Sequence, residues 1–226
     1  MIDPDLMTKN CPYCRTEISD QASICCQCGN PLRPKSQHKR WHWRGIVSRI
    51  TICLLVIAAA VILFYVSLLE TAQKLNSPQR KSLRDAITLI ETKGFTREAF
   101  LLEHVAVYRS SDNWLNSSVA KENAYAATNF PFEIITLYAD FFTYPKDDVE
   151  RAAILLHEAK HLEGADEQEA YEFVWRNRKQ LGWTSDLYRD SPVWDNVRHQ
   201  TRELIPELFS CALNEMNDCT GLPINQ

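Results

Sequence analysis

The sequence predicts an α+β protein built from a small cysteine-rich module, one membrane-spanning helix, and a helix-rich domain with a short sheet. Three observations support this prediction: two cysteine knuckles near the N-terminus, one long uncharged run, and helical spacing of apolar residues after residue 70. Residues 1–69 hold eight basic and four acidic side chains, whereas residues 70–226 hold 17 and 25. This distribution excludes a uniformly basic nucleic-acid binder, and eight cysteines in 226 residues exclude a small disulfide-knotted module.

Residues 1–33 form the predicted N-terminal module. Its two CxxC-type pairs can close a tetrahedron of thiolates around one Zn²⁺, and they consist of Cys11, Cys14, Cys25 and Cys28. The residues between the pairs are too few and too polar to fold without a metal. The string CPYCRTEISDQASICCQCGNPL resembles the zinc-ribbon modules at the termini of many bacterial membrane proteins, which implies a structural zinc. Cys26 is expected to be a filler position rather than a ligand.

The next two segments predict a membrane anchor. Residues 34–49 form a basic juxtamembrane linker, and residues 50–69 carry no charge. Twenty helical residues at about 1.5 Å each cross a hydrocarbon core of about 30 Å. Because the basic residues precede the span and Glu70 follows it, the N-terminus is predicted to be cytoplasmic and residues 70–226 extracytoplasmic, as in a bacterial inner-membrane protein with a periplasmic domain.

The predicted orientation also bears on the partners of the N-terminal module. A cytoplasmic location disfavours the alternative of two disulfides among its cysteines. A ribbon without a basic stripe is more typical of a docking module than of a nucleic-acid reader. We therefore expect an unidentified cytoplasmic partner, and we interpret the basic linker as a topology signal that contacts lipid headgroups.

Residues 70–226 are long enough for one hydrophobic core. Helical periodicity, caps and breakers predict helices, and aromatic and β-branched residues predict extended segments that form a short sheet. Cys211 and Cys219 lie on the predicted extracytoplasmic side, where a disulfide between them is expected. The predicted helices are 78–92, 147–163, 166–181 and 195–214, and the extended segments are 105–108 and 124–143.

The strongest functional pattern is an HExxH motif from His157 to His161. A chain of this composition contains the motif by chance in about one case in a hundred. The two histidines, four residues apart, project from one face of a helix that Asp147 can cap, so both imidazoles can bind one Zn²⁺. Glu158 then lies beside the metal, where a carboxylate can take a proton from activated water and return it to a leaving amine.

A catalytic zinc needs a third protein ligand, which the sequence after Gly164 can supply. If Asp166 caps the next helix, Glu169 falls at the third helical position and can complete a capping box, which leaves Glu167 free to reach the metal. Glu167 is therefore the predicted third ligand, with Glu169 as the first alternative. Glu163 is a weaker alternative, because it follows His161 by only two residues and faces another side of the helix.

The string HEAKHLEGADEQEAYEFV resembles the active-site and glutamate helices of the zincin metallopeptidases, in their gluzincin branch. The resemblance covers roughly residues 120–180, although the glutamate follows unusually closely. It implies a zincin-like domain over residues 70–226, with an edge strand near Asn123–Ala126 that would bind an extended peptide. The motif does not identify an oxyanion donor, for which the candidates are Tyr171, Tyr188 and His199.

The leading functional hypothesis is a membrane-anchored zinc metallopeptidase that cuts an extracytoplasmic protein or peptide. One alternative is a non-catalytic receptor or scaffold with a zincin-like domain, and the intact HExxH motif argues against it because a structural site does not require Glu158. A second alternative is a zinc amidase that acts on a non-peptide amide, since such an enzyme would use the same ligands.

Overall fold

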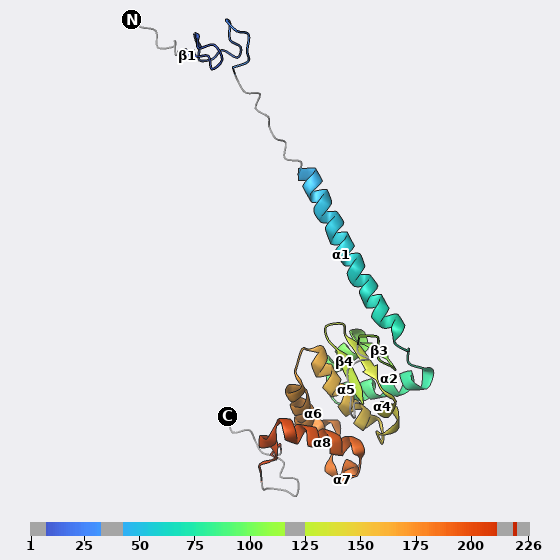
Figure 1. The fold of residues 1–226 in the computed structure, drawn as a ribbon. Helices are drawn as coiled ribbons and strands as arrows, with labels where there is room; N and C mark the ends of the chain where they lie inside the picture. Colours follow the sequence, from blue (N-terminus) through green and yellow to red (C-terminus); the bar gives the residue numbers. More distant parts are fainter. Residues whose placement is uncertain (1–7, 33–42, 116–124, 212–218, 221–226) are drawn as a thin grey trace. The chain divides into compact units, whose positions relative to one another are not determined.

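The computed structural model describes residues 8–32, 43–115, 125–211 and 219–220. The chain divides into two compact units, residues 1–59 and 60–226, and the division falls inside the long helix α1 (Trp43–Thr71; Figure 1). Helices dominate the described residues and the sheets are small, which agrees with the predicted α+β class.

The N-terminal module is a short antiparallel hairpin with two cysteine loops. Strand β1 (Thr8–Asn10) pairs with β2 (Glu17–Ser19), and an isolated bridge joins Ile24 to Pro31. Within residues 8–32 its buried core consists of Cys11, Ile18 and Cys25, with two more side chains packed against them. So small an apolar core is typical of modules that depend on a metal or on cross-links for their stability.

Helix α1 has the length and composition of a membrane span over Gly45–Thr71, and no other helix in the described ranges does. Large apolar side chains from Ile50 to Leu63 are 55% to 69% exposed. Such a surface is stable in hydrocarbon and unfavourable in water. The helix begins at Trp43, so residues 43–49 of the predicted linker are helical, and no proline among them interrupts the helix before the span. Residues 34–42 lie outside the described part.

Two helices follow the end of α1. The first, α2 (Ser77–Thr92), matches the predicted range 78–92 to within one residue and begins at a capping box between Asn76 and Gln79. The second, α3 (Thr96–His104), was not predicted from the sequence and packs against α2. It begins two residues after Gly94, whose backbone has a φ of 91°.

A three-stranded sheet lies in the order β3-β5-β4. Strand β3 (Val107–Arg109) is parallel to β5 (Ile134–Leu137), and β4 (Ala126–Asn129) is antiparallel to β5. The central strand β5 is buried, and β4 is an edge strand, as the sequence predicted for the region near Ala126. Residues 123 and 124 of the predicted edge strand lie outside the described residues.

The predicted extended segment 124–143 is wrong at its C-terminal end. Residues Ala139–Thr143 form the helix α4. Phe141 in this helix is fully buried, so its packing outweighs the preference of aromatic residues for strands.

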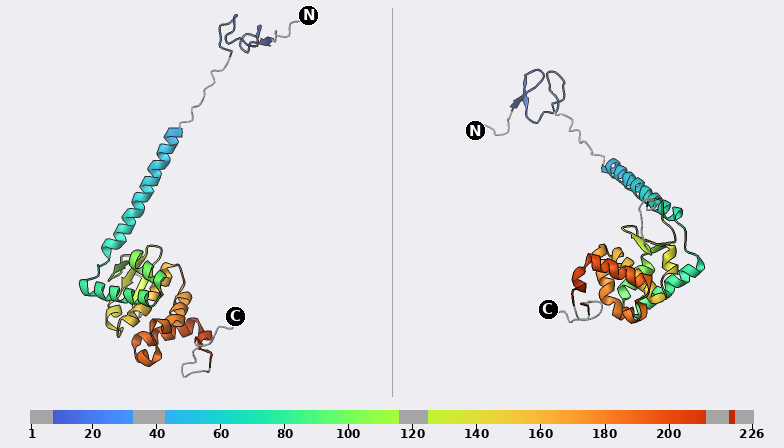
Figure 2. Two further views of the ribbon diagram at one scale, coloured as in Figure 1. Left: turned by 180° about the vertical axis from the view of Figure 1, so that it is seen from behind. Right: turned by 60° about the horizontal axis from the view of Figure 1, so that its bottom comes forward.

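Helices α5 (Asp148–Leu162) and α6 (Glu167–Leu181) agree with the predicted ranges to within one residue at each end. Local signals account for this agreement, because Asp147 caps α5 and Gly182 ends α6 with a φ of 89°. Helix α5 contacts α2, α3, α6 and β4, so the HExxH motif lies on the central helix of the domain (Figures 1 and 2).

The predicted helix 195–214 is confirmed as far as Leu204 and is wrong for the residues described after it, whereas residues 212–214 lie outside the described part. It is divided into α8 (Pro192–Leu204) and a 3₁₀ helix, η1 (Pro206–Phe209), and a short helix α7 (Ser185–Tyr188) precedes it. Pro206 causes the division, because its ring removes a hydrogen-bond donor and clashes with the preceding turn of an α-helix.

Aromatic packing joins these last helices to α6. Trp175 lies 5.2 Å from both Trp194 and Phe209, measured between ring centroids, and Trp183 lies 4.9 Å from Trp194. Such rings bury large apolar areas, so this cluster fixes α8 against α6.

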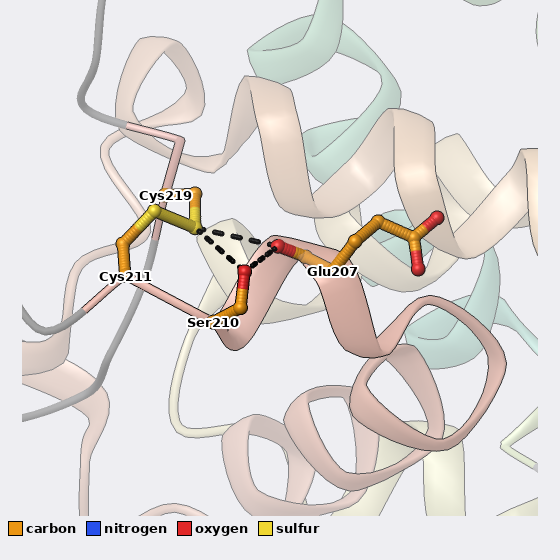
Figure 3. The surroundings of a disulfide bond; sticks show 4 residues. All are labelled: Glu207, Ser210, Cys211 and Cys219. Atoms are coloured by element: carbon orange, nitrogen blue, oxygen red, sulfur yellow. Dashed lines mark hydrogen bonds between the residues drawn. A yellow bond between two sulfur atoms is a disulfide. The ribbon is translucent and has the colours of Figure 1, made fainter.

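The predicted disulfide between Cys211 and Cys219 is present beside η1 (Figure 3). The backbone N–H of Cys219 also donates to the carbonyl of Leu208 at 2.8 Å. The tail of the chain is therefore attached to the end of the aromatic cluster. Residues 214–218, which the disulfide was predicted to staple, lie outside the described part.

Candidate metal centres

The four predicted cysteine ligands come together in the N-terminal module. Their Sγ atoms all lie within 4.8 Å of one another, and the closest pairs are Cys14 with Cys25 at 3.6 Å and Cys11 with Cys28 at 3.7 Å. Four sulfur atoms at these separations can form a tetrahedral shell around one ion.

The two cysteine loops repeat one backbone arrangement. The carbonyl of Cys11 accepts from the N–H of Arg15, and that of Cys25 accepts from the N–H of Gly29, both at 2.8 Å. Arg15 has a φ of 62° and Gly29 a φ of 70°. This left-handed conformation turns each loop back on itself, which brings both cysteines of a pair to the same side.

Cys14 and Cys26 differ in their surroundings. Hydrogen bonding to Thr16 lowers the pKa of Cys14 to about 6, so this thiol reaches the ligating thiolate form at neutral pH. Cys26 is exposed and is not among the clustered thiols, as expected for a filler position.

The second cluster joins the HExxH helix to the start of α6. Nε2 of His157 lies 3.0 Å from Nε2 of His161, and the two nitrogens lie 3.2 Å and 3.4 Å from the carboxylate oxygens of Glu167. These three ligand atoms lie within 4.8 Å of one another. The structure therefore brings together the three side chains that the sequence predicted as ligands of a catalytic metal.

A tight turn between α5 and α6 creates this geometry. Gly164 adopts a φ of 85°, and Asp166 and Glu169 form the expected capping box at the start of α6. Glu169 is thereby engaged at the helix terminus, while Glu167, in the first turn, faces the histidines. Glu163 is paired instead with Lys160 and with Arg97. Of the three acids considered as the third ligand, Glu167 is therefore the one that faces the histidines.

A backbone hydrogen bond orients one of the two histidines. The Nδ1–H of His161 donates to the carbonyl of Ala165 at 2.9 Å, so Nε2 is the nitrogen that carries the lone pair once the ring is neutral. Burial alone would lower the pKa of His161, but the bond to Glu167 and the carbonyl raise it to about 9. The bonds to both histidines hold the pKa of Glu167 far below its usual range.

Glu158, the predicted general base, is 4% exposed and lies on α5, between the two histidines in the sequence. The hydroxyl of Thr128 on β4 donates to its Oε2 at 2.7 Å. This contact was not identified from the sequence, because 30 residues separate the two side chains. The edge strand therefore orients the carboxylate of the HExxH helix.

The second cluster lines a cavity of about 560 Å³. Strand β4 and its loop form one wall, α5 and the start of α6 a second, and α8 a third. Two amide side chains of α8, Asn196 and Gln200, also line the cavity. They lie four residues apart on one helix face, a spacing visible in the sequence, but their position opposite the motif depends on tertiary packing.

No known protein family, curated protein or solved structure matches this chain. The assignment of the site therefore depends on the chemistry and geometry of its own residues.

Only one of the three candidate oxyanion donors lies in the cavity. Tyr171 lines it, with its ring centroid 4.3 Å from that of His157, and burial raises its pKa above the usual range. Tyr188 instead donates to Asp147 at 2.7 Å. His199 is on α8, with its side chain exposed and paired with Glu203.

Proposed function

We propose that this chain is a membrane-anchored zinc metallopeptidase whose catalytic ligands are His157, His161 and Glu167 and whose general base is Glu158. One observation carries the proposal. Three ligand atoms converge at the wall of a cavity, and the buried carboxylate of Glu158 comes from α5, the helix that bears both histidines. A structural zinc site has four protein ligands, whereas a set of three leaves a coordination position for substrate or water.

The donor set fits zinc. Two imidazole nitrogens and one carboxylate are ligands that Zn²⁺ accepts in hydrolytic enzymes. Nδ1 of His157 is buried and has no hydrogen-bond partner among the described residues, so this ring is held by its packing against Tyr171 and would be held further by a metal bond at Nε2. The carboxylate of Glu167 balances one of the two charges of the ion.

The chemistry follows from the positions of the side chains. Zinc supplies Lewis acidity, which activates water and polarises a carbonyl group. Glu158 accepts the proton of the attacking water and transfers it to the leaving amine. Thr128 holds Oε2 of Glu158 and leaves Oε1 available for this transfer. Tyr171 is the candidate donor to the developing oxyanion.

The edge strand supplies a binding surface for an extended peptide. The N–H of Tyr138 donates to the carbonyl of Tyr125, so the main-chain groups of Tyr125 and Ala127 are directed toward β5. The alternation of an antiparallel ladder then directs those of Ala126 and Thr128 away from β5. These groups can bind a substrate strand beside the metal cluster.

The other parts of the chain complete the proposal. Helix α1 is the membrane anchor, and the cysteine cluster binds a second, structural zinc. The basic residues before the span favour a cytoplasmic N-terminal module and a peptidase domain on the other side of the membrane, where it would act on an extracytoplasmic protein or peptide.

The test is a comparison of Glu158→Gln with Glu172→Gln in the purified full chain. Glu172 is on α6, where it pairs with Arg176 on the surface. We expect Glu158→Gln to abolish peptide hydrolysis while zinc content stays unchanged, and Glu172→Gln to retain activity. Undiminished hydrolysis by Glu158→Gln would contradict the proposal. Cleavage of non-peptide amides alone would support the zinc amidase instead.

A further inference from the structure

We propose that the metal-site cavity opens at the membrane surface, and that its substrate is the juxtamembrane segment of another membrane-anchored polypeptide. This inference depends on the proposed peptidase function and on α1 as a membrane span. It is supported by contacts that join the last turns of α1 to the loops of the domain.

The C-terminal end of α1 is packed into the domain. Leu68 is fully buried, and the carbonyl of Leu69 accepts from Nε of Arg109 at 3.1 Å. Beyond the helix, the N–H of Ser110 donates to the carbonyl of Gln73 at 2.8 Å, and the N–H of Gln73 donates to the hydroxyl of Ser111 at 2.9 Å. The domain therefore adjoins the end of the span directly, without a free linker between them.

Two aromatic rings of the domain contact α1 one turn earlier. The ring of Phe64 lies 5.8 Å from that of Trp114 and 5.6 Å from that of Phe132, measured between centroids. The indole N–H of Trp114 donates to the hydroxyl of Ser67 at 3.2 Å. These rings belong to two loops, one after β3 and one between β4 and β5. We name the exposed rings Trp114 and Phe130, together with Phe132, the aromatic rim.

The position of Phe64 in the span sets the depth of the aromatic rim. The uncharged run ends at Leu69, five residues after Phe64, which is about 7.5 Å along a helix. The span Gly45–Thr71 is about 40 Å long, roughly 10 Å more than a hydrocarbon core. The uncharged run of residues 50–69 is itself about 30 Å long, so Phe64 lies within about 7.5 Å of the edge of the hydrocarbon core, and the rings that contact it lie in this outer layer of the bilayer.

The exposure of the aromatic rim fits this location. Trp114 is 49% exposed, Phe130 58%, and the neighbouring Leu115 38%. Large apolar side chains on adjacent loops are unfavourable in water, whereas tryptophan in particular is favoured at the headgroup level of a bilayer. A lipid surface is therefore the environment that covers the aromatic rim.

The aromatic rim is also part of the wall of the cavity. Phe130 lines the cavity and is only two residues from Phe132, which contacts the span. Two residues extend at most about 7 Å, so the cavity wall begins close to the membrane interface. A strand laid along β4 would then lie near the bilayer surface. At about 3.3 Å per extended residue, the segment within about ten residues of a substrate's own span can reach it.

The first test uses the full chain in proteoliposomes. A peptide that the chain cuts in solution is placed at about 4, 10, 20 or 30 residues from the span of single-pass reporter proteins. We expect cleavage at the two near positions to be at least about tenfold faster than at the far positions, because tethering raises the effective concentration only where the cavity can be reached. Equal cleavage at all four distances would overturn the inference while leaving the peptidase intact.

The second test does not need activity. Vesicles with lipids brominated near the headgroups should quench tryptophan emission of the full chain, and the quenched fraction should fall in Trp114→Phe. Trp194→Phe is the matched control, because Trp194 is buried in the aromatic cluster of the domain. Unchanged quenching in Trp114→Phe would place the aromatic rim in water and overturn the inference. If quenching falls but no peptide is cut in solution, the proposed peptidase function fails and the membrane location stands.

Discussion

The hydrogen bond between Thr128 and Glu158 offers a sharp test of how the edge strand serves the HExxH helix. The substitution Thr128→Val removes the hydroxyl and keeps the shape of the side chain. The hydroxyl lies 2.7 Å from Oε2 of a carboxylate that is only 4% exposed. A hydrogen bond to a charged group in such a setting contributes about 1.5–3 kcal/mol.

This energy sets the expected loss of activity. Because about 1.4 kcal/mol corresponds to a factor of ten, kcat should fall about 10- to 100-fold in Thr128→Val. KM and zinc affinity should change little, since Thr128 is not among the predicted ligands. The assay is steady-state hydrolysis of a peptide by the full chain, with zinc content measured on the same samples.

Thr128→Ser is the control, because it retains the hydroxyl. It should recover most of the kcat that Thr128→Val loses. The reasoning would be refuted if the valine variant kept full kcat, or if the serine and valine variants were equally impaired.

Three further predictions concern the two metal clusters. Glu167→Gln should weaken zinc binding at the histidine site at least about tenfold, whereas Glu172→Gln should not, as competition with a chelator would show. In the zinc-free protein, the raised pKa of His161 contributes stability that is complete below pH 6.5 and is lost as pH rises through about 9. Zinc binding near pH 7.5 should therefore release about one proton, which calorimetry in two buffers would measure. This proton release should vanish above pH 10. Cys25→Ser should remove one zinc per chain without loss of peptidase activity, whereas Cys26→Ser should remove none, as metal analysis would show.

The sequence predicted most accurately those features that depend on near neighbours. Asp147 and Asp166 are cap residues followed by helix-forming residues, so α5 and α6 were placed to within one residue. The same capping box separated Glu169 from Glu167. The four cysteines were likewise recognisable from their spacing, since each knuckle is a local structure.

Features set by long-range packing could not be predicted in this way. The contact of Thr128 with Glu158 needs β4 beside α5, and Asn196 reaches the cavity only because the aromatic cluster holds α8 against α6. Residues that resembled a strand in the sequence form α4, in which Phe141 is buried. The early end of α8 is different, because Pro206 was visible in the sequence and its effect on the helix was underestimated.

The most direct measurement of the central claim is zinc stoichiometry combined with X-ray absorption at the zinc edge. We predict two zinc ions per full chain, with a mixed shell of sulfur, nitrogen and oxygen neighbours. The double variant His157→Ala/His161→Ala should keep one zinc with four sulfur neighbours and lose all hydrolysis. The account would be contradicted if the wild-type chain held only the sulfur-bound ion, or if the double variant retained both.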